Sequence, residues 1–230
     1  MSTALQVVLL CGGKGERLRP LTADLPKPLV PINGKPLLGH IVDHAQAHGV
    51  KEFIAAVGYK ADKIKAYLAD DLGLAVELVD SGDADIVRRL ADCAPFIKGD
   101  CLVLYGDTLS DVNLADLAAF HRSRTEKVTI TVWPLRSQFG VLDVDADGKV
   151  VSFQEKPSLD KWINIGYFYF AKEALPWLAG FATFQDFLVH LVARGELNAY
   201  RHTGVHITVN TIKELQEAEE NIGRFQGISK

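Results

Sequence analysis

A cluster of glycines and basic residues follows the first apolar run of the chain. Residues 5–10 are mostly apolar, and the next segment reads Cys11-Gly12-Gly13-Lys14-Gly15-Glu16-Arg17. Glycines in a turn between a strand and a helix let backbone N–H groups approach an anion closely. Arg17 and Lys27 add fixed positive charge, which stabilises a bound polyphosphate. The pattern therefore predicts a phosphate-binding turn, although a tight turn without a ligand would also account for the glycines.

Two common phosphate-binding motifs do not fit this turn. A dinucleotide fingerprint needs a third glycine where Leu18 stands, and an acidic residue after the second strand, where the chain has Gly58-Tyr59. A Walker-type loop needs Gly-Lys-Ser/Thr, but Lys14 precedes Gly15 here. An oxidoreductase that binds a dinucleotide is therefore disfavoured.

A candidate metal ligand closes a later apolar run. Tyr105-Gly106-Asp107 ends the run at residues 101–105, and the carboxyl end of a parallel strand faces the crevice in which ligands bind. Mg²⁺ prefers one or two carboxylates together with phosphate oxygens and water. Asp107 is therefore a candidate ligand for Mg²⁺, and capping of the following turn is the alternative.

The elements that must position these residues alternate between strand and helix. Apolar runs predict strands at 5–10, 53–57, 74–79 and 101–105, and helical spacing predicts helices at 36–48, 61–68, 85–93 and 113–122. Further strands are expected at 128–133, 141–144, 150–153 and 167–170, and further helices at 174–178, 184–192 and 212–221. We expect an α/β protein with a Rossmann-like three-layer α/β/α fold and a mixed, mostly parallel central sheet.

Composition and charge narrow the class of protein. A net charge of −4 disfavours a general nucleic-acid-binding surface. The three cysteines, Cys11, Cys93 and Cys101, lack metal-ligand spacing, which argues against a disulfide framework and a zinc site. No apolar run approaches the roughly 20 residues of a membrane helix, and the N-terminus shows no export signal. We expect a cytoplasmic protein without nucleic-acid or membrane partners.

The glycine-rich turn and Pro26-Lys27-Pro28 together resemble the signature of the sugar-1-phosphate nucleotidyltransferases. This resemblance implies a nucleoside triphosphate and a sugar 1-phosphate as substrates, Mg²⁺ as cofactor, and a homo-oligomer, which is common in the family. It implies one domain over residues 1–230, with a nucleotide-binding half at 1–125 and a sugar-phosphate-binding half at 126–230. Lys27 would contact the reacting phosphates, and Asp107 would bind the metal. Nucleotide contacts would come from Cys11, Gly12, Gly13, Gly15, Glu16 and Arg17.

Three later segments resemble the sugar-facing parts of the same family. They are Phe139-Gly140-Val141, residues 153–157 (Phe-Gln-Glu-Lys-Pro) and residues 164–167 (Asn-Ile-Gly-Tyr). The resemblance implies that the backbone of Gly140 lies against the sugar and that Glu155 and Asn164 hydrogen-bond its hydroxyls. Lys156 would hold the sugar phosphate. A solvated strand end is the ordinary alternative for a Glu-Lys pair.

A further loop favours one branch of the family. Ser81, Gly82 and Asp83, followed by Arg89-Leu90, are most similar to the glucose-1-phosphate cytidylyltransferases. The three loop residues would lie near the base and ribose, and Arg89 near the phosphates or the sugar. A surface loop that caps a helix is the alternative. The loop is one residue shorter than in that branch and lacks its paired glycines, which leaves the choice of base open.

A second departure concerns the metal site. Asn210 stands where the family usually has a second metal-binding aspartate, and it offers a carbonyl oxygen without negative charge. The implied reaction is in-line attack of the sugar phosphate on the α-phosphorus of the triphosphate, with Arg17, Lys27 and Lys156 as catalytic residues and CTP favoured. The alternatives are a guanylyl- or other nucleotidyltransferase acting on a different sugar phosphate, such as a heptose 1-phosphate, and a catalytically silent nucleotide-sugar-binding domain.

Overall fold

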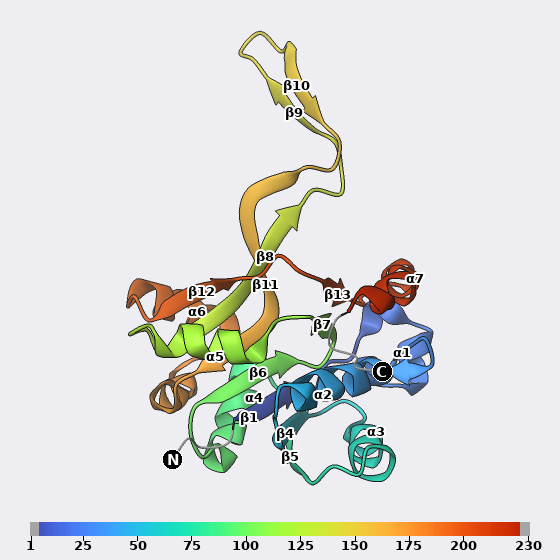
Figure 1. The fold of residues 1–230 in the computed structure, drawn as a ribbon, viewed down its shortest axis with the longest axis vertical. Coiled ribbons are helices and arrows are strands. Elements are labelled where there is room, and N and C mark those ends of the chain that lie inside the picture. Colours follow the sequence, from blue (N-terminus) through green and yellow to red (C-terminus); the bar gives the residue numbers. More distant parts are fainter. Residues whose placement is uncertain (1–4, 226–230) are drawn as a thin grey trace.

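A seven-stranded sheet forms the centre of the computed structural model, which describes residues 5–225 (Figure 1). Its strands lie in the order β12-β8-β11-β6-β1-β4-β5. β11 runs antiparallel to its neighbours β6 and β8, and the other neighbouring pairs are parallel. The expected mixed, mostly parallel sheet is therefore confirmed. The strands are β1 (Gln6–Leu10), β4 (Glu52–Val57), β5 (Val76–Asp80), β6 (Cys101–Tyr105), β8 (Val128–Arg136), β11 (Ser158–Phe170) and β12 (Leu197–Arg201).

Helices cover both faces of this sheet, which confirms the three-layer arrangement. Alternate residues of a strand point to opposite faces, so Val7 and Leu9 of β1 enter one core and Val8 enters the other. The first core contains residues of α2 (Leu37–Ala47), α3 (Ala61–Ala66), α5 (Leu114–Arg122) and α7 (Ile212–Asn221). The second contains residues of α4 (Ile86–Cys93), the 3₁₀ segment Lys172–Gly180 and α6 (Phe184–Ala193).

Short elements complete the chain between these layers. α1 (Leu21–Asp24) follows the 3₁₀ turn Glu16–Leu18, and the 3₁₀ turn Lys27–Leu29 precedes the small β2–β3 pair (Pro31–Ile32 and Lys35–Pro36). A π-helical turn (Tyr67–Asp71) extends α3, and 3₁₀ turns follow α4 (Ala94–Phe96) and α7 (Ile222–Arg224). β7 (Thr108–Ser110) pairs antiparallel with β13 (His206–Thr208).

Side-chain caps fix where three helices begin. The side chain of Asn113 accepts hydrogen bonds from the backbone N–H groups of Ala115 and Asp116 at the start of α5. Asp85 caps α4 through the N–H of Val87. Thr211 and Glu214 form a capping box at the start of α7, and this box sets the position of the preceding Asn210.

The structure differs from the sequence expectation in the second half of the chain. β11 begins at Ser158, well before the expected residue 167, because its first part carries polar residues that pair with β8 without an apolar pattern. A 3₁₀ segment replaces the α-helix expected at 174–178, and Pro176 lies inside it. Residues 126–230 supply β8, β11 and β12 to the same sheet as residues 1–125. The division into two functional halves stays a prediction.

An arm formed by residues 137–157 projects from the sheet (Figure 1). It contains β9 (Val141–Val144) and β10 (Val150–Gln154), which pair with each other as a separate two-stranded sheet. A turn at Asp147-Gly148 joins them, and Gly148 has φ +83°, which favours glycine. Among residues 5–225, no single helix has the length and apolar character to cross a membrane, although the bent pair of Lys172–Gly180 and α6 passes that test when combined.

Candidate active site

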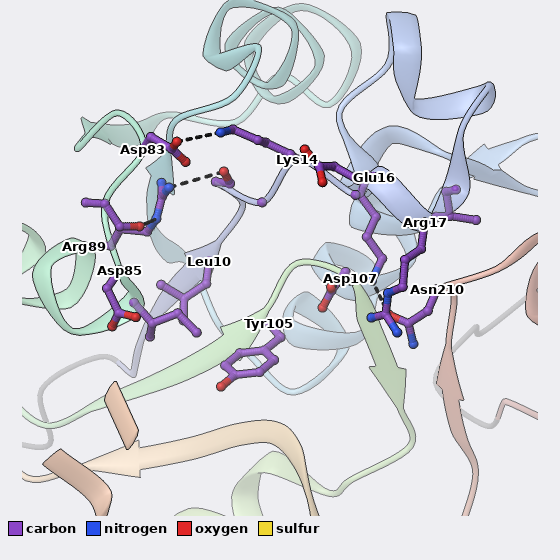
Figure 2. Close-up of a pocket in the computed structure, with 17 residues that line it drawn as sticks. Leu10, Lys14, Glu16, Arg17, Asp83, Asp85, Arg89, Tyr105, Asp107 and Asn210 are labelled. Atoms are coloured by element: carbon purple, nitrogen blue, oxygen red, sulfur yellow. Dashed lines mark hydrogen bonds and ion pairs between the residues drawn. The ribbon is translucent and has the colours of Figure 1, made fainter. Parts of the chain in front are cut away.

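A cavity of about 600 Å³ opens at the carboxyl ends of β1 and β6 (Figure 2). Strands at the centre of a parallel sheet converge here, which is where α/β proteins bind ligands. The cavity is lined by Leu10, Gly12, Gly13, Lys14, Gly15, Glu16, Arg17, Leu18, Lys27, Asp83, Ala84, Asp85, Ile86, Arg89, Tyr105, Asp107 and Asn210. The glycine-rich turn therefore meets Lys27, Asp107 and Asn210 in one place, as the sequence predicts.

Two of the three glycines of the turn, Gly12 and Gly15, are required by close packing. A Cβ on Gly12 would lie 1.7 Å from Nη1 of Arg89, so a larger residue cannot occupy this position. Gly15 has φ +63°, and a Cβ there would lie 2.8 Å from the Cβ of Lys27. A Cβ on Gly13 would meet no atom within 4 Å, so this part of the backbone borders open space. The turn thus presents its backbone to the cavity on one side and packs tightly on the other.

Two cations and two oxygen ligands converge at one end of the cavity. Nζ of Lys27, which is 7% exposed, donates hydrogen bonds to Oδ2 of Asp107 at 2.6 Å and Oδ1 of Asn210 at 2.8 Å. Nη2 of Arg17 donates to the same Oδ1 of Asn210 at 2.9 Å. These side chains come from three distant parts of the chain, and Figure 2 shows Arg17, Asp107 and Asn210 grouped at this end. The arrangement concentrates positive charge around a single acidic side chain.

The side chain of Asn210 is held in one orientation. Its Nδ2 donates to Oγ1 of Thr208 at 2.9 Å, so its Oδ1 faces Lys27 and Arg17. Its backbone N–H donates to Oε2 of Glu214 in the capping box of α7. Asn210 therefore aligns the side chains of Lys27 and Arg17, and its Oδ1 is also available to a metal ion. The residue type of Asn210 did not reveal its contact with these two cations.

Arg89 has a different environment from the one expected. Its guanidinium is buried beneath the cavity and donates to four backbone carbonyl oxygens, those of Gly12, Val57, Gly82 and Ala84. These donor groups hold the chain, and Arg89 also lines the cavity, so the expected contact of Arg89 with the phosphates or the sugar stays a prediction. Arg89 joins the glycine-rich turn to the loop at residues 81–84.

The loop at residues 81–83 places one of its three predicted residues in the cavity. Asp83 lines the cavity and accepts a hydrogen bond from Nζ of Lys14 at 2.5 Å across its mouth (Figure 2). This hydrogen bond lowers the pKa of Asp83. Ser81 instead donates to Oδ2 of Asp92, and Gly82, with φ +60°, turns the chain. Ser81 and Gly82 are not among the lining residues, so their nucleotide contacts stay predictions.

Cys11 also lies outside the cavity lining. Its side chain is buried, and a Cβ on Gly106 would lie 2.8 Å from its Sγ. Burial raises the pKa of the Cys11 thiol, so the thiol stays protonated. The side chain therefore packs in the core, and a nucleotide contact of Cys11 stays a prediction.

Asn164 lies beside the cavity. Its Oδ1 accepts a hydrogen bond from the N–H of Gly166 at 2.8 Å, and it lies near Tyr105, a lining residue. Burial raises the pKa of Tyr105 to about 12, and the nearby Asn164 acts in the opposite direction. Tyr105 thus presents a neutral hydroxyl at the edge of the cavity. The sequence gave no reason to single out Tyr105 beyond its position near Asp107.

The remaining sugar-facing residues lie on the arm and do not line the cavity. Gly140 precedes β9 and Glu155 follows β10, and the two residues lie close together, since a Cβ on Gly140 would lie 3.2 Å from Oε2 of Glu155. Lys156 is exposed and has φ +46°. Gly140, Glu155 and Lys156 are not among the residues that line this cavity, so their expected contacts with the sugar and its phosphate stay predictions.

Comparison with known proteins identifies the family. The model of the family described as nucleotidyl transferase matches residues 6–194. The chain belongs to the nucleotidyl transferase family. As a nucleotidyl transferase, it is 35% identical over 253 residues to the probable glucose-1-phosphate cytidylyltransferase of Bacillus subtilis, with 98% of this chain and 99% of the relative covered. It is also 35% identical to the glucose-1-phosphate cytidylyltransferase of Salmonella typhi, over 91% of this chain and 93% of the relative.

A solved structure supports the same assignment. The nucleotidyl transferase resembles the crystal structure of HddC from Yersinia pseudotuberculosis with a TM-score of 0.74 and 25% identity, over 95% of this chain and 99% of that chain. The resemblance to sugar-1-phosphate nucleotidyltransferases, and to their cytidylyltransferase branch, is therefore confirmed.

Proposed function

We propose that this nucleotidyl transferase couples a nucleoside triphosphate to a sugar 1-phosphate, with CTP and glucose 1-phosphate as the favoured pair. The observation that carries the proposal is the contact of Lys27 with Asp107 and Asn210 beside the glycine-rich turn. A cationic site of this kind suits a reaction between two polyanions. The names of the two cytidylyltransferase relatives support the choice of substrates.

The reaction needs alignment and charge neutralisation more than proton transfer. An oxygen of the sugar phosphate forms a bond to the α-phosphorus, the bond from that phosphorus to its bridging oxygen breaks, and pyrophosphate leaves with the electron pair. Because the nucleophile is already an anion, no general base is required. Arg17 and the amides of the turn offset charge on the departing pyrophosphate, and Lys27 offsets charge at the α-phosphate.

A divalent cation, Mg²⁺, fits the same end of the cavity. Oδ2 of Asp107 and Oδ1 of Asn210 already share the ammonium group of Lys27, so these two oxygens suit a cation. Among the described residues, no group of three or more His, Cys, Asp or Glu side chains could hold a metal. Asp107 and Asn210 would hold Mg²⁺ together with phosphate oxygens and water, and the ion would offset charge on the reacting phosphates.

The test is a screen of the four nucleoside triphosphates against a panel of sugar 1-phosphates that includes glucose and heptose forms, with Mg²⁺. Pyrophosphate release and the mass of the nucleotide sugar are measured. We expect turnover with CTP and glucose 1-phosphate, and loss of turnover when EDTA removes the metal. A preference for GTP and a heptose 1-phosphate would support the proposed type of reaction but would replace CTP and glucose 1-phosphate as its substrates. No turnover with any pair would overturn the proposal.

A binding-only domain is the second candidate, because Asn210 supplies no second negative charge for a metal. Calorimetry on the same samples separates the two functions: tight binding of a nucleotide sugar without turnover supports the second candidate.

The cysteine thiols of Cys11, Cys93 and Cys101 are all buried and unpaired with one another, which suits the cytoplasm as the compartment of the reaction.

A further inference from the structure

A second cavity, of about 420 Å³, lies between the base of the arm, β13 and α7. β13 and α7 are neighbours in Figure 1. Among the described residues, the linings of this cavity and of the active-site cavity have none in common. Trp133, on the wall of the second cavity, packs against the first core, whereas Tyr105, on the wall of the active-site cavity, packs against the second core. The second cavity therefore lies on a different side of the central sheet.

Two arginines line this cavity, Arg136 at the end of β8 and Arg224 in the 3₁₀ turn after α7. Neither forms an ion pair with any residue that the structure describes. The guanidinium carbon of Arg136 lies 5.3 Å from the centre of the Trp133 ring. The acidic residues of the lining are engaged elsewhere, Glu214 in the capping box of α7 and Glu217 with a lysine on its own helix. Two guanidinium groups in this state suit a phosphate, because each can bind two of its oxygens.

The rest of the wall suits a ligand that carries hydroxyl groups. Gln138 and Asn221 bring side-chain amide oxygens, Thr208 brings a hydroxyl, and Trp133 brings an apolar surface. The indole N–H of Trp133 donates to the carbonyl oxygen of Gly204 at 3.0 Å, which fixes the ring. Amides and hydroxyls bind the hydroxyls of a ligand, and an aromatic ring covers an apolar part of it. With the two arginines, this wall fits a sugar phosphate, and the volume is that of a small-molecule site.

Two residues of the second cavity hold Asn210 of the active site in place. Oγ1 of Thr208 accepts a hydrogen bond from Nδ2 of Asn210 at 2.9 Å, and Oε2 of Glu214 accepts one from its backbone N–H at 2.6 Å. Thr208 and Glu214 line the second cavity, whereas Asn210 lines the active-site cavity. A ligand hydroxyl that bonds Thr208 or Glu214 therefore competes with the hydrogen bonds that orient Asn210.

We propose that the second cavity binds a sugar phosphate as a regulatory ligand, separate from the substrate, and that its occupancy slows the reaction by releasing Asn210. Arg136 and Arg224 hold the phosphate of this ligand, and its hydroxyls reach Thr208 and Glu214. The effect on the rate rests on the proposed function, whereas binding in the second cavity does not.

The direction of the effect follows from what Asn210 holds. Its Oδ1 accepts hydrogen bonds from both Arg17 and Lys27, so a released Asn210 aligns these two cations less firmly. The same oxygen is then offered less well to Mg²⁺. Coupling between two binding sites is reciprocal, so Mg²⁺ should weaken binding of the regulatory ligand by the factor by which the ligand weakens binding of Mg²⁺.

Calorimetry with glucose 6-phosphate tests the cavity without an activity readout, because this probe has a phosphate and hydroxyls but no 1-phosphate for the proposed reaction. We expect the wild type to bind it with a Kd below about 1 mM. The variant with Arg136→Ala and Arg224→Ala should bind at least about tenfold more weakly, and inorganic phosphate should bind the wild type at least about tenfold more weakly than the probe. Lys27→Ala, which damages the active-site cavity, is the matched control and should keep wild-type affinity. No binding at about 10 mM probe, affinity unchanged in the double variant, or equal affinity for inorganic phosphate would overturn the proposed site.

Rates measured with the substrate pair from the screen test the regulation. At limiting Mg²⁺, saturating glucose 6-phosphate should slow the wild type by about fivefold, the lower end of ordinary coupling between sites. The double variant of Arg136 and Arg224 should keep the basal rate and lose this response. Thr208→Val should be slow without any ligand, because Asn210 loses its acceptor. Inhibition retained in the double variant, or binding without a change in rate, would overturn the regulatory role. If no substrate pair gives turnover, the proposed function fails, and binding that depends on Arg136 and Arg224 still supports the site.

Discussion

Lys27 and Asp107 form an ion pair at the centre of the site, with Nζ and Oδ2 2.6 Å apart and side-chain exposures of 8% and 36%. The lysine is the more buried partner, and Asn210 supplies its second acceptor at 2.8 Å. A phosphate that approaches Lys27 must compete with these two oxygens. Both oxygens would then become available to a metal ion, so binding of the nucleotide and binding of the metal would reinforce each other.

Replacement of Lys27 by alanine should lower kcat by about 10²–10³-fold, the loss typical of one preorganised charge at a developing anion. Steady-state kinetics with saturating CTP and glucose 1-phosphate measures the effect. Lys98→Ala is the matched control, because Lys98 pairs with Glu52 at the surface, and it should keep wild-type turnover. A Lys27→Ala enzyme with near-normal kcat would contradict the assigned role.

Replacement of Asn210 by aspartate should reduce the Mg²⁺ concentration needed for half-maximal activity by several-fold. The second carboxylate adds negative charge beside Asp107, which strengthens binding of a divalent cation. Asn210→Ala should behave oppositely and also lower the rate at saturating Mg²⁺, since Arg17 and Lys27 lose a shared acceptor. Magnesium titrations of the three enzymes provide the comparison. Identical titration curves would show that residue 210 does not contact the metal.

The sequence predicts best the features that local chemistry fixes. The strands of the first half are buried on both faces, so apolar runs mark them, and the tight turn at Gly12 and Gly15 leaves no room for larger residues. Asp107 follows a buried strand, and this placement alone locates it at the cavity. The positive charges near that turn predict Arg17 and Lys27 as phosphate contacts, and the structure brings both residues to the same place.

The sequence predicts less well what depends on distant partners. Nothing near Arg89 in the chain reveals that four carbonyl oxygens, from the glycine-rich turn, the end of β4 and the loop at residues 81–84, surround its guanidinium. The motif around Lys156 indicates a role but not a location, because the length of β8 and β11 determines how far the arm extends. Asn210 was expected to face a metal, whereas the bond from its side chain to Thr208 directs it toward two cations.

Replacement of Arg89 by lysine should lower the free energy of unfolding by about 2–4 kcal/mol. A lysine cannot bond four carbonyl oxygens at once, and each buried oxygen left without a partner costs about 1–3 kcal/mol. Urea unfolding measures the change, and Arg88→Lys is the control, because the neighbouring Arg88 is exposed and pairs with Asp92. Unchanged stability combined with a raised KM for the sugar phosphate would support the substrate-binding interpretation of Arg89.

Stability should fall as the pH is lowered from 7 to 5, and His44 should account for part of the fall. Burial lowers the pKa of His44 from 6.5 to about 4, so the unfolded chain binds the proton more tightly than the folded protein does. The stabilisation from neutral His44 is fully present at pH values above 6.5, the pKa of His44 in the unfolded chain. It is lost as the pH falls toward about 4, the pKa of His44 in the folded protein. Linkage gives a loss of about 2 kcal/mol from this residue between pH 7 and pH 5.

The variant His44→Gln removes the titrating group, and its side-chain amide can still donate to the carbonyl oxygen of Val112, which Nε2 of His44 contacts at 2.9 Å. Urea unfolding at pH 7 and pH 5 should therefore show a smaller difference in this variant than in the wild type. Burial also lowers the pKa of His206 to about 4, and it lowers the pKa of His40 and of His121, so a residual slope should remain in this variant. Gln46→Ala, at an exposed position on α2, should keep the full wild-type slope. Equal slopes in His44→Gln and wild type would mean that His44 binds its proton equally well in the folded and the unfolded chain, and this would contradict the lowered pKa of His44 in the folded protein.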